Sequence, residues 1–180
     1  LLDAGHICGS AMIDIEYENK RLLYTGDFKM EETRMHKGAK PVEDVDILMI
    51  DSTYALKDHP SRKDAEKKLM DEIEEITGMG GIVLFPAFSL GRSQELISVI
   101  RSHNKDIPIY LDGMGKKLTD IYEKYSKYLK DPAEFKKHVR TINRVYTPRD
   151  RREAVKRPGV IISSAGMMEG GPVLGYLTNL

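Results

Sequence analysis

The chain has 180 residues, 41% of them hydrophobic, and its 28 basic and 28 acidic side chains give a formal net charge of zero. This length predicts one core, or one complete domain with part of another, and the balanced charge argues against polyanion binding by the whole surface. No apolar stretch reaches the roughly 18 residues of a membrane helix, and the single cysteine, Cys8, excludes an internal disulfide and favours a reducing, cytoplasmic location.

The first 50 residues predict an antiparallel segment. Apolar and acidic residues alternate from Met12 to Tyr17, a polar turn follows, and a second apolar run covers residues 21–24. This pattern is typical of a β-hairpin with one solvated face. The continuous apolar run of residues 47–50 predicts a buried strand.

Strands and helices alternate from about residue 47 onward. Ser61, with Asp64 three residues later, predicts the start of a helix that ends near Gly78. The other elements expected are strands at residues 82–85, 107–111 and 160–162, and helices at residues 96–100 and 117–129. The alternation predicts an α/β fold with a doubly wound parallel sheet. We expect a domain boundary near residue 55, between segments 1–55 and 56–180.

Polar residues follow several apolar runs of the first segment. His6 lies shortly after Leu1 and Leu2, Asp27 follows the run ending at Tyr24, and Asp51 directly follows Ile50. Imidazole and carboxylate groups at strand ends are suitable ligands for Zn²⁺. A catalytic zinc usually takes about three protein ligands, so these residues alone are too few. We interpret the remaining histidines as surface residues: His36, His59, His103 and His138.

Two loops of the α/β segment have features of anion-binding sites. In the first, Gly91 allows close backbone approach and Arg92 offers a guanidinium fork. The helix that begins there would add free amide donors for a bound anion. The second is a glycine-rich turn, residues 163–172, with two serines at its head. We expect both loops at the carboxyl edge of the sheet, where open α/β folds bind ligands. Taken singly, either loop is also compatible with a tight turn that binds nothing.

Two further patterns have competing interpretations. Residues 136–157 contain nine basic side chains against two acidic ones, which fits either a patch that follows phosphates or a solvated helix and loop. Tyr122, Tyr125 and Tyr128 recur every three residues. A base-stacking platform is one interpretation, and ordinary packing is the one we favour.

Five segments resemble, in this order, the β-CASP branch of the metallo-β-lactamase superfamily. They are Asp-Ala-Gly-His-Ile-Cys-Gly-Ser (3–10), Tyr-Thr-Gly-Asp (24–27), Asp-Ser-Thr-Tyr (51–54), Gly-Arg-Ser-Gln-Glu (91–95) and Ser-Ala-Gly-Met-Met-Glu-Gly-Gly-Pro (164–172). Within this branch the chain resembles archaeal proteins similar to the endonuclease subunit of the cleavage and polyadenylation specificity factor. The resemblance implies a parallel-sheet αβα β-CASP domain attached to a partial metallo-β-lactamase αββα sandwich.

The resemblance also implies roles for individual residues. His6 matches a metal ligand, Asp27 matches the carboxylate that bridges two zinc ions, and Asp51 matches an acid that supports the metal site. A bridging carboxylate suits two cations about 3.5 to 4 Å apart, which activate water and neutralise charge at phosphorus. The remaining residues are implied in RNA or phosphate binding: Ser52, Gly91, Arg92, Gln94, Glu95, Ser163, Ser164 and Gly166.

The implied function is zinc-dependent hydrolysis of single-stranded RNA, mainly endonucleolytic and also 5′ exonucleolytic, by a protein that forms a homodimer. The alternatives are a catalytically inactive RNA-binding subunit and a DNA-processing relative. The family's His-x-His-x-Asp-His motif and its later histidines are not in this sequence. We therefore expect the chain to be a fragment that binds zinc poorly and cleaves nothing by itself.

Overall fold

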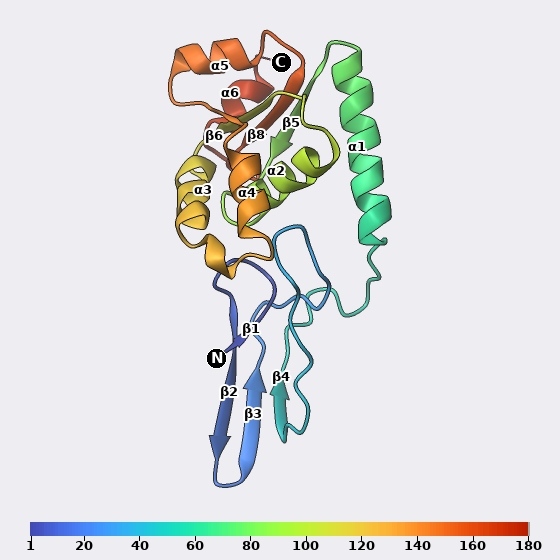
Figure 1. Cartoon of the computed structure of the whole chain (residues 1–180), viewed down its shortest axis with the longest axis vertical. Helices are drawn as coiled ribbons and strands as arrows, with labels where there is room; N and C mark the ends of the chain where they lie inside the picture. Colours follow the sequence, from blue (N-terminus) through green and yellow to red (C-terminus); the bar gives the residue numbers. More distant parts are fainter. Residues whose placement is uncertain (180) are drawn as a thin grey trace. The chain divides into compact units, whose positions relative to one another are not determined.

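The computed structural model describes residues 1–179, which form two compact units (Figure 1). Unit 1 comprises residues 1–60 together with 127–130, and unit 2 comprises residues 61–126 and the chain from Asp131 onward.

Unit 1 is built on a four-stranded mixed sheet. Its strands lie in the order β1 (Leu2–Asp3), β2 (Ala11–Tyr17), β3 (Lys20–Tyr24) and β4 (Ile47–Met49). The first three strands are antiparallel neighbours, whereas β4 pairs parallel to β3. The predicted hairpin is confirmed, but the expectation of a single solvated face is wrong, because Ile13, Ile15 and Tyr17 are also exposed. Figure 1 shows β2 and β3 as the long ribbon of this unit, and Arg21 pairs across it with Asp14 at 2.8 Å.

The predicted burial of residues 47–50 is wrong. Strand β4 forms, but Ile47, Leu48 and Met49 are each about half exposed. Among the described residues β4 pairs only with β3 and is therefore an outer strand of the sheet. The core of unit 1 forms elsewhere, around Ala4, Met12, Leu23 and Ala39. A continuous apolar run is typical of a strand covered on both faces, and this unit provides no such cover.

Unit 2 contains the predicted parallel sheet. Its strands lie in the order β5 (Ile82–Pro86), β8 (Gly159–Ser163), β6 (Ile109–Asp112) and β7 (Asn143–Arg144), and all pairs are parallel. The α/β fold class is therefore confirmed. Pro86 is the last residue of β5, as expected for a residue that lacks a backbone N–H. Strand β7 was missed because it has two residues, both polar.

Helices cover both faces of this sheet. On one face Ile161 of β8 packs against Ala154 and Tyr176. Side chains alternate along a strand, so Val160 and Ile162 point to the other face, where both are also fully buried.

No helix among residues 1–179 is long and apolar enough to cross a membrane. The helices are α1 (Arg62–Gly78), α2 (Arg92–His103), α3 (Gly115–Lys124), α4 (Pro132–Val139), α5 (Pro148–Ala154) and α6 (Val173–Leu177).

The predicted start of α1 is confirmed, because the Ser61 hydroxyl oxygen accepts a hydrogen bond from the Asp64 amide at 3.1 Å. The helix predicted over residues 117–129 is shorter. It ends as α3 at Lys124, and residues 126–128 form a separate 3-10 turn.

Candidate functional site

The carboxyl ends of three strands of unit 1 lie along the same edge of its sheet. Strands β1 and β3 are both antiparallel to β2, and β4 is parallel to β3, so β1, β3 and β4 run in one direction. His6 follows β1, Asp27 follows β3 and Asp51 follows β4. The fold therefore brings the three residues that the sequence singled out to one sheet edge.

Hydrogen bonds join the turns that carry these residues. The Lys29 amide donates to the Ala4 carbonyl oxygen at 2.9 Å, which ties the segment after Asp27 to the segment before His6. The Thr25 hydroxyl oxygen accepts from the Asp51 amide at 3.1 Å. The turns after β1, β3 and β4 are thus fixed to one another by hydrogen bonds that involve backbone groups.

The His6 loop is held by local hydrogen bonds. The Ser10 hydroxyl oxygen accepts from the amides of both His6 and Ile7 at 3.2 Å. The Asp3 carboxylate accepts from the Gly5 amide at 2.9 Å. Because the backbone is fixed while the His6 side chain is exposed, the imidazole is presented to solvent from a rigid loop.

Asp51 is held in its charged form. Its carboxylate accepts hydrogen bonds from the Thr53 hydroxyl at 2.6 Å and from the Thr53 amide at 3.0 Å. These bonds, together with the nearby charge of His6 and the Ser52 amide, hold the pKa of Asp51 below its usual range. His6 and Asp51 are therefore close enough to interact electrostatically.

The two predicted phosphate loops lie at the carboxyl edge of the unit 2 sheet. They follow β5 and β8, which are neighbouring parallel strands. The Ala87 amide donates to the Ser163 carbonyl oxygen at 2.9 Å. A methyl group at Gly166 would lie 2.8 Å from the Phe88 amide nitrogen, so the two loops pack backbone to backbone only because residue 166 is glycine. Their predicted location is confirmed.

Comparison with known proteins agrees with this arrangement. A family model described as the Beta-Casp domain matches residues 93–180. A probable RNase MJ4 of Methanocaldococcus jannaschii is 40% identical over 98% of this chain, and an RNase named aCSPSF2 of Saccharolobus solfataricus is 41% identical over all of it. Cleavage and polyadenylation specificity factor subunit 3 of Dictyostelium discoideum is 33% identical over 94%.

The chain belongs to the β-CASP family. It spans 43% of the Methanocaldococcus protein, 37% of the Saccharolobus protein and 23% of the Dictyostelium protein.

The donors at the unit 1 edge of this β-CASP protein fit zinc in chemical type. An imidazole and a carboxylate, both exposed, are ligands that zinc accepts. They fall short in number. Among residues 1–179 no group of three or more histidine, cysteine, aspartate or glutamate side chains is arranged to hold a metal ion. His6 and Asp27 can therefore contribute to a zinc centre but do not complete one.

Three residues predicted to contact RNA or phosphate have other roles in the β-CASP fold. Gln94 is fully buried and its amide donates to the Ser89 and Gly115 carbonyl oxygens. Ser163 is also fully buried, so neither side chain reaches a ligand directly. Glu95 pairs with Arg62 of α1, which joins two helices. We correct the roles of Gln94 and Ser163 from direct contact to support of the loops, whereas the contact of Glu95 with RNA or phosphate stays a prediction.

The start of α2 also differs from the expectation of free amide donors. The Arg92 amide donates to the Leu90 carbonyl oxygen at 2.9 Å, and the Ser93 amide donates to the Phe88 carbonyl oxygen at 3.2 Å. Loop carbonyls thus occupy two of the donors that a phosphate would use. The Arg92 side chain is exposed, so any anion binding here depends mainly on its guanidinium group.

Sequence reasoning missed a buried carboxylate at the same β-CASP sheet edge. Asp112, the last residue of β6, is fully buried. It accepts hydrogen bonds from Arg151 Nε at 2.6 Å, Lys116 Nζ at 3.1 Å and the Tyr176 hydroxyl at 3.1 Å. The signal was present, because Asp112 follows an apolar run and precedes a glycine, as Asp51 follows its own run.

Burial alone raises the pKa of Asp112, but the hydrogen bonds from Arg151, Lys116 and the Gly113 amide outweigh burial and hold the pKa below its usual range. The same burial, together with the neighbouring Asp112 charge, raises the pKa of Tyr176. The cluster is therefore an ionised carboxylate bound by two cations and a neutral phenol.

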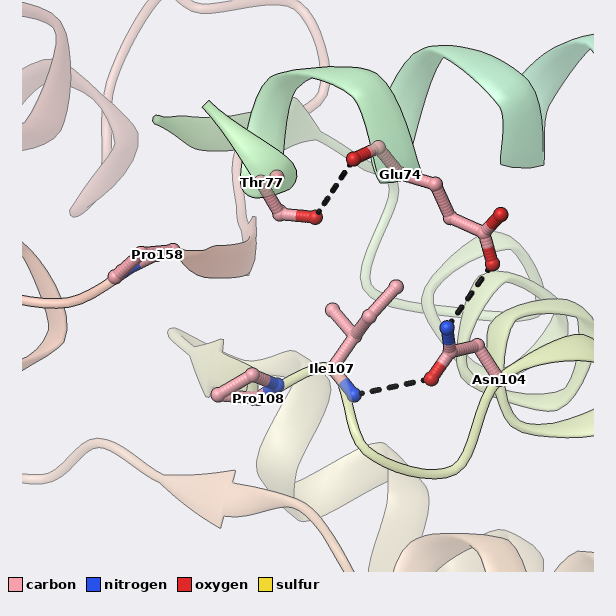
Figure 2. Close-up of a pocket in the computed structure, with 7 residues that line it drawn as sticks. Glu74, Thr77, Asn104, Ile107, Pro108 and Pro158 are labelled. Atoms are coloured by element: carbon pink, nitrogen blue, oxygen red, sulfur yellow. Dashed lines mark hydrogen bonds between the residues drawn. The ribbon is translucent and has the colours of Figure 1, made fainter. Parts of the chain in front are cut away.

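A hollow of unit 2 that is lined in part by Glu74, Thr77 and Asn104 lies away from these loops. Figure 2 shows Ile107 and Pro108 before β6 and Pro158 before β8, so the hollow is at the amino edge of the sheet. Its polar groups are paired within the chain, with Asn104 Nδ2 donating to Glu74 at 2.9 Å.

Gly5 provides a test of the His6 loop. Its φ is +65°, and a methyl group there would lie 2.5 Å from the Lys29 carbonyl oxygen. We expect Gly5→Ala to lower the free energy of unfolding by roughly 2 to 4 kcal/mol, since the left-handed conformation and the overlap both cost energy. Chemical denaturation measures this change.

Gly9 is the matched control, because its φ is +89° but no atom lies within 4 Å of a methyl group placed there. We expect Gly9→Ala to cost only about 1 to 2 kcal/mol. Equal costs for the two variants would contradict close packing of Gly5.

Proposed function

We propose that a protein of the length of these relatives, carrying this chain, is a zinc-dependent ribonuclease that hydrolyses single-stranded RNA. The observation that carries the proposal is the common edge of unit 1, where His6, Asp27 and Asp51 follow three strands that run in one direction. The names of the two archaeal relatives, both called RNases, support RNA as the substrate. We propose a cytoplasmic location and a homodimer for the whole protein.

In this proposal His6 and Asp27 hold zinc together with ligands from outside the chain. Zinc bound there would activate water and neutralise the charge that develops at phosphorus. Asp51 acts through His6, since the charges of the two side chains interact and a nearby carboxylate makes an imidazole a stronger metal ligand. The exposed Ser52 hydroxyl lies beside Asp51 and can donate a hydrogen bond to a phosphate oxygen.

Unit 2 would hold the RNA backbone. Arg92 offers an exposed guanidinium, which matches a phosphate in geometry and charge. Gly91 permits a close approach of the RNA backbone, and Ser164 is partly exposed at the head of the second loop. Gly166 contributes indirectly, because the space beside it is filled by the Phe88 backbone and it thereby lets the two loops pack together. Because these groups recognise phosphates and not bases, we expect little sequence preference from them.

The test uses a protein of the relatives' length that contains this chain. We expect it to cleave a labelled single-stranded RNA with zinc present, to stop when the metal is chelated, and to leave a DNA of the same sequence largely intact. We expect the 180-residue chain alone to cleave neither.

Two outcomes favour the alternatives. Binding of RNA without cleavage, with zinc present, supports a catalytically inactive RNA-binding subunit. Faster cleavage of DNA than of RNA supports a DNA-processing protein. Cleavage that persists after complete removal of zinc would contradict the proposed mechanism.

A further inference from the structure

An exposed aromatic ring lies beyond the carboxyl end of β7 in unit 2. Tyr146 follows this short strand and is 64% exposed. The Lys116 ammonium group lies 4.8 Å from the centre of the ring, a cation–π distance that stabilises the orientation of the ring. Lys116 also donates to the Val145 carbonyl oxygen, so the lysine is fixed beside the residue that precedes the tyrosine.

A guanidinium group is linked to this lysine through Asp112. Lys116 Nζ and Arg151 Nε bind the same carboxylate, at 3.1 Å and 2.6 Å. The Arg151 side chain nevertheless remains 40% exposed. The buried carboxylate therefore orients a guanidinium group that is still exposed to solvent. The same carboxylate also binds the lysine that contacts Tyr146.

The segment between the ring and the guanidinium is rigid. Thr147 and Asp150 form a complete capping box at the start of α5. The Asp150 carboxylate accepts from the Tyr146 amide at 2.9 Å and from the Thr147 amide at 2.8 Å. Because both groups are fixed before a ligand arrives, binding costs little conformational entropy.

We propose that Tyr146 and Arg151 form a binding site for one nucleotide of single-stranded RNA, with the base stacked on the Tyr146 ring and a phosphate bound by Arg151. This inference rests on the proposed function, because it names RNA contacts of the same protein. Aromatic platforms beside fixed positive charges are the usual means of binding single strands. Asp112 is a positioning residue that touches no RNA.

The surrounding charge supports this site. Residues 136–157 carry nine basic and two acidic side chains, and one of the two acids, Asp150, is occupied by the amides of the capping box. Arg149 and Arg152 are exposed on α5 beside Arg151. Arg144 and Lys156 are paired with acidic side chains, so the positive charge that attracts a phosphate backbone here comes mainly from Arg149 and Arg152. Tyr146 distinguishes this surface from a merely solvated basic helix.

The test measures binding of a fluorescent oligouridylate of about 12 nucleotides to the 180-residue chain over a range of salt concentrations. We expect Tyr146→Ala to weaken binding about tenfold with an unchanged salt dependence, and Tyr146→Phe to bind within about twofold of wild type. We expect Arg151→Gln to weaken binding several-fold and to reduce the slope of log K against log salt by about 0.7.

Matched controls are available elsewhere in the chain. Tyr128 is 60% exposed and has a lysine ammonium 4.9 Å from its ring, and Lys63 is an exposed basic residue on α1, outside residues 136–157. We expect Tyr128→Ala and Lys63→Gln to bind nearly as wild type does. If the wild-type chain binds RNA and Tyr146→Ala weakens this binding no more than Tyr128→Ala does, this inference is overturned and the proposed function is not. An absence of RNA binding by the wild-type chain overturns both this inference and the proposed RNA contacts.

Discussion

Replacing Asp112 by asparagine is expected to lower the free energy of unfolding by about 3 to 5 kcal/mol. The substitution keeps the shape of the side chain but removes the charge that Arg151 and Lys116 bind. The side chain of Lys116 is only 14% exposed, so its ammonium group would be left partly buried without a counter-ion. Chemical denaturation of the chain, followed by circular dichroism, measures the loss.

Asp120 provides the matched control, because it also pairs with an arginine, Arg144, but its side chain is 58% exposed. Exposed pairs contribute at most about 1 kcal/mol, so Asp120→Asn should have little effect. Equal losses for Asp112→Asn and Asp120→Asn would show that burial of the carboxylate is not what makes Asp112 important.

The stability that Asp112 contributes also depends on pH. Its pKa is lower in the folded chain than in the unfolded chain, so the stabilisation is fully present above the unfolded value of about 3.9. It is lost as the pH falls through the lower, folded pKa. An asparagine side chain at this position cannot titrate, so the difference in stability between wild type and Asp112→Asn should shrink in this acidic range.

Replacing Asp27 by alanine in a protein of the relatives' length is expected to lower the rate of RNA cleavage by more than about 100-fold. Loss of a residue that contacts a metal ligand, but not the metal itself, costs roughly 10- to 100-fold. The reason is that Asp27 is proposed to bind the metal directly. Asp51→Asn should fall within that smaller range, since Asp51 is proposed to act through His6. Initial cleavage rates at saturating zinc measure both effects.

Asp58 is a suitable control because it is an exposed aspartate of the same unit and lies outside the sheet edge. We expect Asp58→Ala to retain wild-type activity, and all three variants to bind RNA as wild type does. A cleavage rate for Asp27→Ala close to that of Asp58→Ala would exclude Asp27 as a ligand.

Much of the fold was predictable because local patterns and packing agree. The hairpin of β2 and β3 follows from strict alternation, and the cap at Ser61 follows from side-chain chemistry within one turn. Strand β4 shows where local pattern fails. The sequence indicates that residues 47–50 are apolar, but burial depends on which other layers cover them, and within the described chain none does.

The site was predictable where polar residues interrupt an apolar pattern. His6, Asp27 and Asp51 stand out for that reason, and the direction of three strands then brings them to one edge. Gln94 was misassigned because an amide in the first turn of a helix looks the same in sequence whether it faces solvent or the core. The contact of Arg151 with Asp112 spans 39 positions, a separation that no local pattern reveals.

The most direct test of the central claim is the location of zinc in crystals of a protein of the relatives' length that contains this chain, measured by anomalous scattering at the zinc edge. The account predicts zinc within about 2.0 to 2.2 Å of a His6 ring nitrogen and of an Asp27 carboxylate oxygen. Zinc bound by other residues, with His6 and Asp27 both beyond coordination distance, would contradict it.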